Sequence, residues 1–358
     1  MMPFVRSGEG GSTRPRPVIA ALKPVDAEAL RISVVIPTCK RPDLLCRCLD
    51  AVFAQTLDPR AFEVIVVDDG HSDDTLAVVD AFRARPGPTV RFVRPRHGRG
   101  PAVARNAGWR AAYGKIIAFT DDDTVPAPDW LERGERALVP GLVALCGRVA
   151  VPRTGADGRR GDDYRPTDHE LMTRGLETAE FVTANAFVRR SALLSVGGFD
   201  ERFLRAWRED SDLQFRLLRD AGPVGRSEDA VVEHPVRPER WGVCLRQQKN
   251  VFFDALLYKK HPQLYRERIL KAPPWDYYAI VALTVAAPLL WAADIGGSAA
   301  VSLLLAAIGV LRLAIRRLRR TARTPEHIAE MVVTSALIPF LSVYWRLRGA
   351  IHFRVLFL

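Results

Sequence analysis

The stretch that decides the fold is IIAFTDDDTVPAPDW, residues 116–130. An apolar run over residues 116–119 leads, after one threonine, into three successive aspartates at 121–123. Neighbouring carboxylates raise one another's pKa unless positive charge neutralises them. Asx-turns before Pro126 and Pro128 would account for one such aspartate. Three at the end of a buried strand are better explained by a hard divalent cation, which takes oxygen ligands.

Upstream of this stretch, short apolar segments alternate with segments of helical spacing. Strands are predicted at residues 31–37 (RISVVIP), 62–67 (FEVIVV), 90–93 and 116–119. Helices are predicted at 43–56 with Asp43 as the N-cap, at 72–83, and at 101–113 with Pro101 in its first position. This alternation predicts an α/β fold, a mostly parallel sheet flanked by helices.

Acidic residues stand where two of these strands end. Asp68 and Asp69 follow the second strand, and the aspartates at 121–123 follow the fourth. Ligands of parallel sheets bind at the carboxyl ends of the strands. A dinucleotide-binding fold would need G-x-G-x-x-G after the first strand, but residues 37–43 read PTCKRPD, without glycine. A bound nucleotide is therefore expected to be held through metal and side chains.

Charge and cysteine content narrow the class of protein. Of the 358 residues, 48 % are hydrophobic and 26 % charged, which is typical of globular or membrane-associated chains. The net charge of +11 favours an anionic partner. The arginines gather beside apolar segments and no nucleic-acid-binding motif is recognisable, so nucleic acid is not predicted as a partner. Five scattered cysteines indicate a reducing compartment, and none stands in a zinc-ligand pattern.

Five segments in order carry a resemblance to a known family: PTCKRPD, VVDDGHSDDT, ARNAGWRAAYGKIIAFTDDDTVPAPDWL, NAFVRRSALLSVGGFDE and WREDSDLQFRLLRDAG. Over residues 32–234 the chain resembles the family 2 glycosyltransferases, of the bacterial type with a C-terminal membrane-associated segment. The resemblance implies a GT-A-like fold with a Rossmann-like nucleotide-binding half. It also implies a nucleotide-sugar donor and Mg²⁺ or Mn²⁺ as cofactor.

The resemblance assigns donor-side roles residue by residue. Thr38 and Asp69 match positions that hold the nucleobase and ribose, and Arg105 matches a position lining the nucleotide pocket. Asp121 and Asp123 match the outer aspartates of the D-x-D motif, which bring the metal to the diphosphate. His234 matches a position that supplies a further metal ligand, although a His-Pro after a strand is as often a loop residue.

On the acceptor side, Asp210 matches the catalytic base, with Glu209 and Trp207 as expected acceptor contacts. A metal ion stabilises charge on the leaving phosphate, and a carboxylate takes the proton of the attacking hydroxyl. One base opposite the leaving group gives a single displacement with inversion. The alternative for Glu209 and Asp210 is that acids favour the first turn of a helix through its dipole. Trp207 could equally be a core aromatic residue.

The last third of the chain differs in kind. Residues 246–270 mix basic and aromatic residues and predict an amphipathic basic helix, suited to an anionic membrane surface, with a basic solvated face as the alternative. Residues 277–293 and 298–311 are uncharged and predict a helical hairpin in the membrane, with buried soluble helices as the alternative. RRLRR follows at 316–320 and is expected on the cytoplasmic side. Because the hairpin crosses the membrane an even number of times, the catalytic domain is expected in the cytoplasm too.

A third apolar segment, residues 328–345, contains Glu330 and Pro339 and is followed by arginines. If it crossed the membrane, those arginines would end outside. A re-entrant or interfacial helix therefore fits the charge rule better.

The chain thus divides into four predicted parts: a disordered N-terminal segment (1–30), a GT-A catalytic domain (31–245), a basic helical linker (246–275) and membrane-associated helices (276–358). The predicted function is transfer of a sugar to an acceptor hydroxyl, on a lipid-linked or envelope polysaccharide or glycolipid precursor, at the cytoplasmic membrane. The alternative is a degenerate nucleotide-sugar-binding protein without transfer activity. Retention of Asp69, Asp121, Asp123 and Asp210 favours the enzyme.

Overall fold

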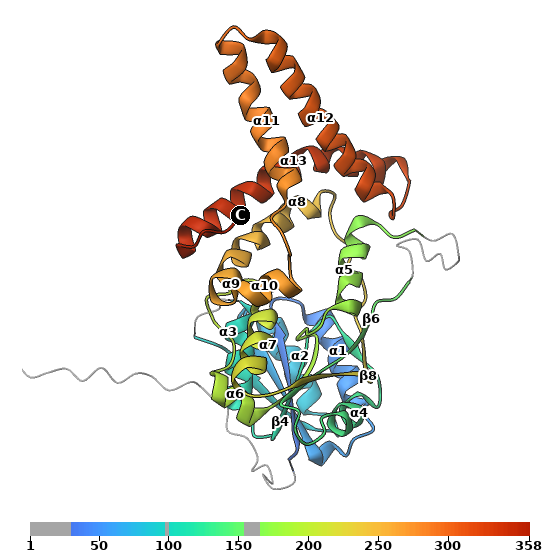
Figure 1. The fold of residues 1–358 in the computed structure, drawn as a ribbon. Coiled ribbons are helices and arrows are strands. Elements are labelled where there is room, and N and C mark those ends of the chain that lie inside the picture. The colour runs from blue at the N-terminus through green and yellow to red at the C-terminus, as the bar shows by residue number, and fades with distance from the viewer. Residues whose placement is uncertain (1–29, 97–99, 154–164) are drawn as a thin grey trace, which may run out of the picture.

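The computed structural model describes residues 30–96, 100–153 and 165–358. The segment predicted to be disordered, 1–30, lies outside the described residues except for Leu30. The described chain forms a helix-covered sheet at one end and long helices at the other, joined by a layer of short helices (Figure 1).

The sheet has eight strands in the order β3-β2-β1-β4-β7-β6-β8-β5. Their bounds are β1 Ile32–Thr38, β2 Phe62–Asp68, β3 Thr89–Val93, β4 Ile116–Thr120, β5 Val125–Pro126, β6 Ala144–Ala150, β7 Asn185–Arg189 and β8 Val224–Glu233. β3, β2, β1 and β4 are parallel. β7 is antiparallel to β4 and β6, whereas β6 and β8 are parallel. The prediction of a mostly parallel sheet is confirmed, and each predicted strand lies within one residue of the observed one.

The helices of this part are α1 Pro42–Phe53, α2 Asp73–Arg83, α3 Pro101–Ala111, α4 Trp130–Ala137, α5 Asp168–Thr178, α6 Arg190–Val196 and α7 Glu209–Asp220. Asp43 is not the N-cap of α1, as the sequence suggested. Arg41 occupies that position, because Pro42, whose φ is already helical, takes the first turn and places Asp43 inside it.

The strands bury side chains on both faces of the sheet. In β1, Val34 and Ile36 pack in one core cluster with α1 and α2, whereas the intervening Val35 packs in a second cluster with α3, α6 and α7. Successive side chains of a strand point to opposite faces, so a strand covered on both sides is apolar throughout. This is why the β-branched runs mark the strands in the sequence.

The segment 246–270 is not the single helix that was predicted. It forms parts of α8 (Val243–Gln247) and all of a 3₁₀ helix η2 (Gln248–Phe253), α9 (Asp254–Lys260) and α10 (Pro262–Arg268). Pro262 cannot continue a helix, because it lacks the N–H, and it begins α10 instead. Apolar side chains of η2, α9 and α10 pack in a third core cluster against Phe203 and Phe215.

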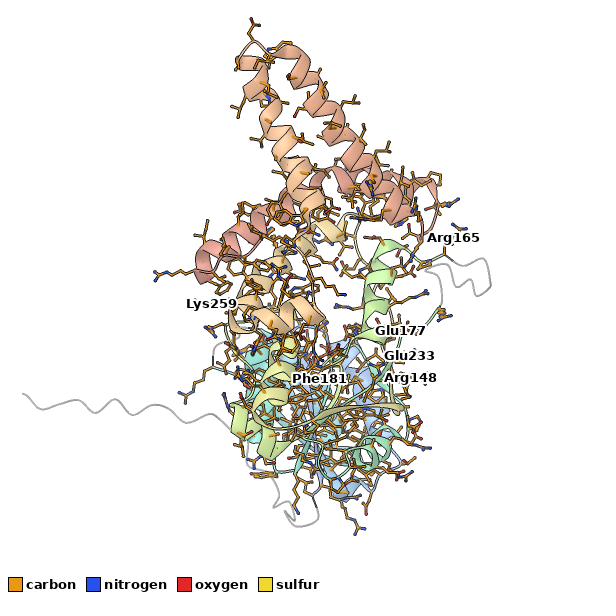
Figure 2. All side chains as sticks on the ribbon, viewed as in Figure 1. Arg148, Arg165, Glu177, Phe181, Glu233 and Lys259 are labelled. Carbon is orange, nitrogen blue, oxygen red and sulfur yellow. The ribbon has the colours of Figure 1, made fainter. Side chains whose placement is uncertain are left out.

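Three helices of the described chain are long and apolar enough to cross a membrane by length and composition: α11 (Trp275–Ala292), α12 (Gly296–Leu318) and α13 (Pro325–Phe353). The hairpin of α11 and α12 stands away from the sheet, and its outer side chains have no other element beside them (Figure 2). α13 runs crosswise at the base of the hairpin (Figure 1). The predicted helical hairpin is therefore observed.

Candidate active site

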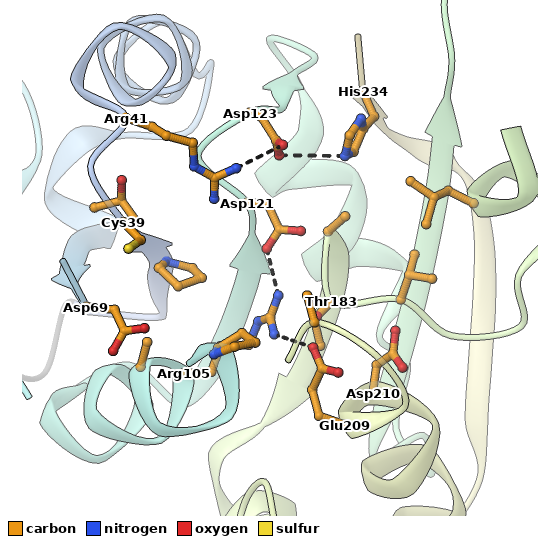
Figure 3. A pocket seen from close by; sticks show the side chains of 18 of the residues that line it. Cys39, Arg41, Asp69, Arg105, Asp121, Asp123, Thr183, Glu209, Asp210 and His234 are labelled. Carbon is orange, nitrogen blue, oxygen red and sulfur yellow. Dashed lines mark hydrogen bonds and ion pairs between the residues drawn. The ribbon is translucent and has the colours of Figure 1, made fainter. Parts of the chain in front are cut away.

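A cavity of about 310 Å³ opens at the carboxyl ends of β1, β2 and β4. Figure 3 shows its lining, to which the ends of β1, β2, β4 and β8, the segment before β7 and the first turns of α3 and α7 contribute. It brings together all but one of the residues singled out in the sequence: Thr38, Asp69, Arg105, Asp121, Asp123, Glu209, Asp210 and His234. Segments almost 200 residues apart in the sequence thus meet at one sheet edge.

The three aspartates after β4 do not point the same way. Asp121 and Asp123 line the cavity, whereas Asp122 is fully buried behind it. Asp122 accepts a hydrogen bond from the Thr38 hydroxyl at 2.6 Å and pairs with Arg41 at 2.9 Å. Burial raises the pKa of Asp122 to about 7 against the opposing charge of Arg41. The middle carboxylate is therefore structural, and it also engages the hydroxyl of Thr38.

Basic side chains offset the repulsion between the outer aspartates. Asp123 lies 3.4 Å from Arg41 and 3.2 Å from Arg237. Asp121 accepts a hydrogen bond from Arg105 at 2.8 Å. Burial opposes ionisation of Asp121, but the Arg105 guanidinium holds the pKa of this carboxyl below its ordinary value. Both outer carboxylates are thus held in place by basic partners.

Arg41 and Arg237 were not among the predicted site residues. Arg41 belongs to PTCKRPD and follows the carboxyl end of β1. This position at the ligand edge of the sheet could have identified it as a site residue. Arg237 follows β8 in a Pro-rich segment whose path the sequence does not indicate.

The acidic pair after β2 is divided between two tasks. Asp68 is fully buried and accepts hydrogen bonds from the backbone N–H groups of Gly70 and Ser72, which fixes the turn into α2. Asp69 lines the cavity and accepts a hydrogen bond from the Gly100 backbone N–H at 3.0 Å. Only the second carboxylate faces the predicted nucleotide site.

Arg105 is buried on α3 and connects two parts of the cavity. One guanidinium nitrogen donates to Asp121 and the other to Glu209, at 2.8 and 2.9 Å (Figure 3). Glu209 is itself 3 % exposed, and burial together with the charge of Asp210 raises its pKa to about 7. These partners occupy both terminal nitrogens of Arg105.

Asp210 differs from its neighbour Glu209. It is half-buried, lines the cavity, and its carboxylate accepts a hydrogen bond from the Ser211 backbone N–H at 2.7 Å. Burial raises the pKa of Asp210 above its ordinary value. Glu209 is anchored by Arg105, whereas Asp210 is held by the backbone of its own helix turn. A carboxylate with a raised pKa at a cavity wall is suited to proton transfer.

His234 lies beside the acidic cluster. Its Nε2 atom is 3.6 Å from a carboxylate oxygen of Asp123, and its buried Nδ1 has no hydrogen-bond partner in the described part of the chain. No group of three or more His, Cys, Asp or Glu side chains among the described residues could hold a metal ion alone. Carboxylate oxygens nevertheless suit Mg²⁺ and Mn²⁺, and Mg²⁺ is usually bound by one or two carboxylates plus substrate phosphates and water. The donor set fits such a shared site.

Trp207 is the exception among the predicted residues, because it does not line this cavity. It lines a second cavity of about 480 Å³ between α5, the α8–η2 segment and the base of the hairpin. Its indole N–H donates to Asp254 at 2.9 Å, and the Arg208 guanidinium lies 4.6 Å from its ring centre. A direct contact of Trp207 with a ligand in the first cavity is therefore not supported by the geometry.

The family assignment rests on comparison with known proteins. Residues 33–197 match the family described as Glycosyl transferase family 2, and residues 116–346 match Glycosyl transferase family group 2. The chain belongs to the family 2 glycosyltransferases. Both matched ranges of this glycosyltransferase include the acidic cluster after β4. The second range, 116–346, also includes Asp210 and extends through α11 and α12 into α13.

Curated relatives carry glycosyltransferase names. The chain is 29 % identical to Glycosyltransferase AglE of Haloferax volcanii, over 62 % of this chain and 71 % of the relative. It is 29 % identical to Validoxylamine A glucosyltransferase of Streptomyces hygroscopicus subsp. limoneus, over 71 % of this chain and 63 % of that one. It is 31 % identical to Succinoglycan biosynthesis protein ExoO of Rhizobium meliloti, over 51 % and 50 %.

A solved structure supports the fold. The glycosyltransferase superposes on mannosyltransferase PcManGT from Pyrobaculum calidifontis, solved in complex with GDP-Man and Mn²⁺, with a TM-score of 0.57. The superposition covers 88 % of this chain and 87 % of the other, at 20 % identity. At this identity the likeness concerns the fold, and the predicted GT-A-like fold is confirmed.

Proposed function

We propose that this glycosyltransferase moves a sugar from a nucleotide-sugar donor to an acceptor hydroxyl, with a divalent cation and with inversion at the anomeric carbon. The observation that carries the proposal is the single cavity in which Asp69, Asp121, Asp123 and Asp210 meet. A degenerate binding protein would have no need of a separate carboxylate opposite the acidic cluster. The intact set favours transfer over binding alone.

On the donor side, Asp121 and Asp123, with His234 beside them, would hold Mg²⁺ or Mn²⁺. When bound, the cation supplies Lewis-acid stabilisation of the negative charge that develops on the leaving diphosphate. Thr38 and Asp69 lie at the ends of β1 and β2, where the nucleoside is expected. Arg41 and Arg237 add positive charge at the cation side of the cavity, which favours the diphosphate electrostatically. The solved structure of similar fold holds Mn²⁺ and GDP-Man, which supports a nucleotide sugar and a divalent cation as the ligands of this cavity.

On the acceptor side, Asp210 would take the proton of the attacking hydroxyl. Its raised pKa brings its proton affinity closer to neutral pH, and it faces the cavity from the start of α7. With one base on the side opposite the diphosphate, the reaction is a single displacement. Glu209, held by Arg105, would fix the wall beside the base rather than exchange protons during turnover.

The acceptor is proposed to be lipid-linked, a precursor of an envelope polysaccharide or glycolipid. The second cavity, whose wall includes Trp207, lies between the catalytic domain and the membrane-type helices. Its lining combines aromatic, amide, apolar and arginine side chains, among them Trp207, Gln247, Leu313 and Arg316. Such a lining suits a polar head with an apolar chain, and Trp207 would contact the acceptor there.

The cytoplasmic face of the membrane is the proposed location. RRLRR at 316–320 ends α12 at the side of the hairpin nearest the catalytic domain (Figure 1). Basic residues flanking an apolar helix favour the cytoplasmic side and an anionic surface. α13 is proposed to be interfacial, because it runs crosswise to the hairpin, has His352 in its last turn and is followed by Arg354.

The test is a transfer and hydrolysis screen of the full-length protein with UDP-, GDP- and dTDP-sugars, with and without Mn²⁺. Turnover with one donor class and its loss on chelation are expected. Asp123→Ala should abolish Mn²⁺-dependent turnover while the protein stays folded, because its partners Arg41 and Arg237 are partly exposed and Arg41 keeps its pair with Asp122. Arg133→Ala, at an exposed ion pair of α4, is the control. Full turnover of Asp123→Ala in saturating Mn²⁺ would contradict the metal assignment.

A further inference from the structure

A buried carboxylate outside the cavity holds the segment that carries the proposed base. Asp254 is the first residue of α9 and is 3 % exposed. One of its oxygens accepts hydrogen bonds from the Trp207 indole N–H at 2.9 Å and from Arg208 Nε at 2.7 Å. The other accepts a hydrogen bond from the Tyr265 hydroxyl at 3.3 Å. Asp254 thus joins the layer of short helices to the two residues that precede Glu209.

Arg208 has a backbone conformation that needs such support. It has φ = 75°, in the left-handed region, and occupies the N-cap position of α7. Non-glycine residues with positive φ are uncommon, and strained conformations persist where the surrounding structure enforces them. Its carbonyl oxygen accepts the Asp212 N–H at 2.9 Å, which closes the first turn of α7. The backbone of Arg208 therefore sets the direction in which Glu209 and Asp210 leave the loop.

The side chain of Arg208 is fixed from two sides. Its Nε donates to Asp254, and its guanidinium stacks on Trp207, which donates to the same carboxylate. The three groups form a closed arrangement in which Asp254 is the shared acceptor. Removal of its charge would leave the half-buried Arg208 guanidinium without its carboxylate partner, at a point one residue from Glu209.

We propose that Asp254 is a positioning residue, which fixes the Arg208 backbone so that the carboxylates at the start of α7 face the cavity. The inference rests on the proposed role of Asp210. Asp254 does not line the cavity that holds Asp210, so its effect on the proposed base passes through the neighbouring pair Trp207 and Arg208. It lies on α9, whose Leu256 and Leu257 pack in the third core cluster. The geometry of the proposed base therefore depends on a layer beyond the sheet that carries the donor site.

The predicted signature is a loss of turnover without loss of donor binding. Misplacement of a reacting group by about 1 Å can cost about 100-fold in rate. Asp254→Asn should therefore lower kcat by about 10- to 100-fold, while the nucleotide-sugar Kd with Mn²⁺, measured by calorimetry, stays within about threefold. Arg208→Gln should have the same effect. The double variant should be no slower than the worse single variant, because both substitutions break one unit.

Two further variants keep the test decisive. Arg208→Lys retains the charge but lacks Nε, so it should lose most of the turnover even if Asp254→Asn folds poorly. Arg268→Ala breaks the exposed 2.6 Å pair between α10 and Glu180, another link of the same layer to the catalytic domain, and should leave kcat unchanged. The inference is overturned if Asp254→Asn and Arg208→Lys retain wild-type kcat, if donor Kd rises in parallel with the loss, or if the effects are additive. An inactive wild-type protein would instead contradict the proposed function.

Discussion

Asp121 and Glu209 accept hydrogen bonds from one guanidinium, that of Arg105, at 2.8 and 2.9 Å. The two carboxylates come from the end of β4 and the start of α7, 88 positions apart in the sequence. Arg105 is 3 % exposed and lies between them. The proposed metal side and the proposed base side of the cavity are thus joined by a buried cation.

Arg105→Leu is expected to lower the free energy of unfolding by about 3–5 kcal/mol, because it leaves buried Glu209 without its partner. Chemical denaturation measures the loss. Adding Glu209→Gln should restore part of the stability, since the buried charge is gone. Arg110→Ala, which breaks an exposed pair on the same helix, is the control. Equal stability of Arg105→Leu and Arg110→Ala would show that the buried connection contributes nothing.

Asp210→Asn keeps the shape of the side chain but cannot accept a proton. General-base catalysis contributes typically 10²–10⁴-fold, so kcat should fall by about that factor while donor Kd stays nearly constant. In the wild type, kcat should decline as pH falls through the pKa of Asp210, which lies above the ordinary aspartate value because of burial. The sign follows because only the deprotonated carboxylate accepts the proton. A collapse of donor affinity instead would identify Asp210 as a binding residue.

The sequence predicted the strands β1 to β4 well because both faces of this part of the sheet are covered. Val34, Val35 and Ile36 are all buried, so the β1 run is continuous and easily recognised. The acidic cluster was also predictable as a site. Which of its aspartates line the cavity and which one is buried was not predictable. Asp122 turns inward to Thr38 and Arg41, and nothing in three identical residues indicates which one is buried.

Contacts between distant segments were beyond the sequence patterns. The basic and aromatic residues of 246–270 suggested a membrane surface, yet Phe253 and Tyr265 are buried in a core cluster. The position of Trp207 in the second cavity depends on Asp254, 47 residues later. The residue types near one position in the sequence do not indicate which distant element will contact it in the fold.

A second buried carboxylate connects α7 to the layer of short helices. Asp212 has no exposed side-chain area and accepts from Lys260, His261 and Arg216 at 2.5, 3.1 and 2.8 Å. Burial opposes its ionisation, but these partners, His261 foremost, hold the pKa of Asp212 below its ordinary value. Asp212→Asn should cost about 3–5 kcal/mol of unfolding free energy at pH 7, because it breaks a buried ionic group.

The pH dependence of that loss has a definite sign. A carboxyl group whose folded pKa lies below its unfolded value of about 3.9 stabilises the protein above that pH, and the contribution disappears as pH falls through the folded pKa. The stability difference between wild type and Asp212→Asn should therefore be full at pH 6 and shrink below pH 4. Asp220→Asn, at an exposed pair of the same helix, should change little at either pH. A difference that grows on acidification would contradict the ion-pair account.

The end of the chain is part of the folded core. Phe357 has no exposed area and packs with Tyr265 and Tyr258 in the third cluster. Phe357→Ala should lower the free energy of unfolding by about 3–5 kcal/mol. Its neighbour Leu356 is 86 % exposed, so Leu356→Ala is the matched control and should have no effect. A protein ending at Lys271 would lose Phe357 and is therefore expected to aggregate, which light scattering would detect.

The hairpin of α11 and α12 is proposed to lie in the membrane, and its exposed apolar side chains provide the test. On α12, the apolar side chains Leu304 and Ile308 are 60 % and 51 % exposed. A basic residue at the centre of a membrane helix costs about 2.5–3.5 kcal/mol. The wild-type protein should remain in the membrane pellet after alkaline carbonate washing, whereas Leu304→Arg combined with Ile308→Arg should release a substantial share of it. Leu194→Arg, at an exposed site on α6, should stay in the pellet with the wild type. Release of the wild type by carbonate would indicate that the hairpin does not span, and would favour a subunit interface as the partner of its apolar surface.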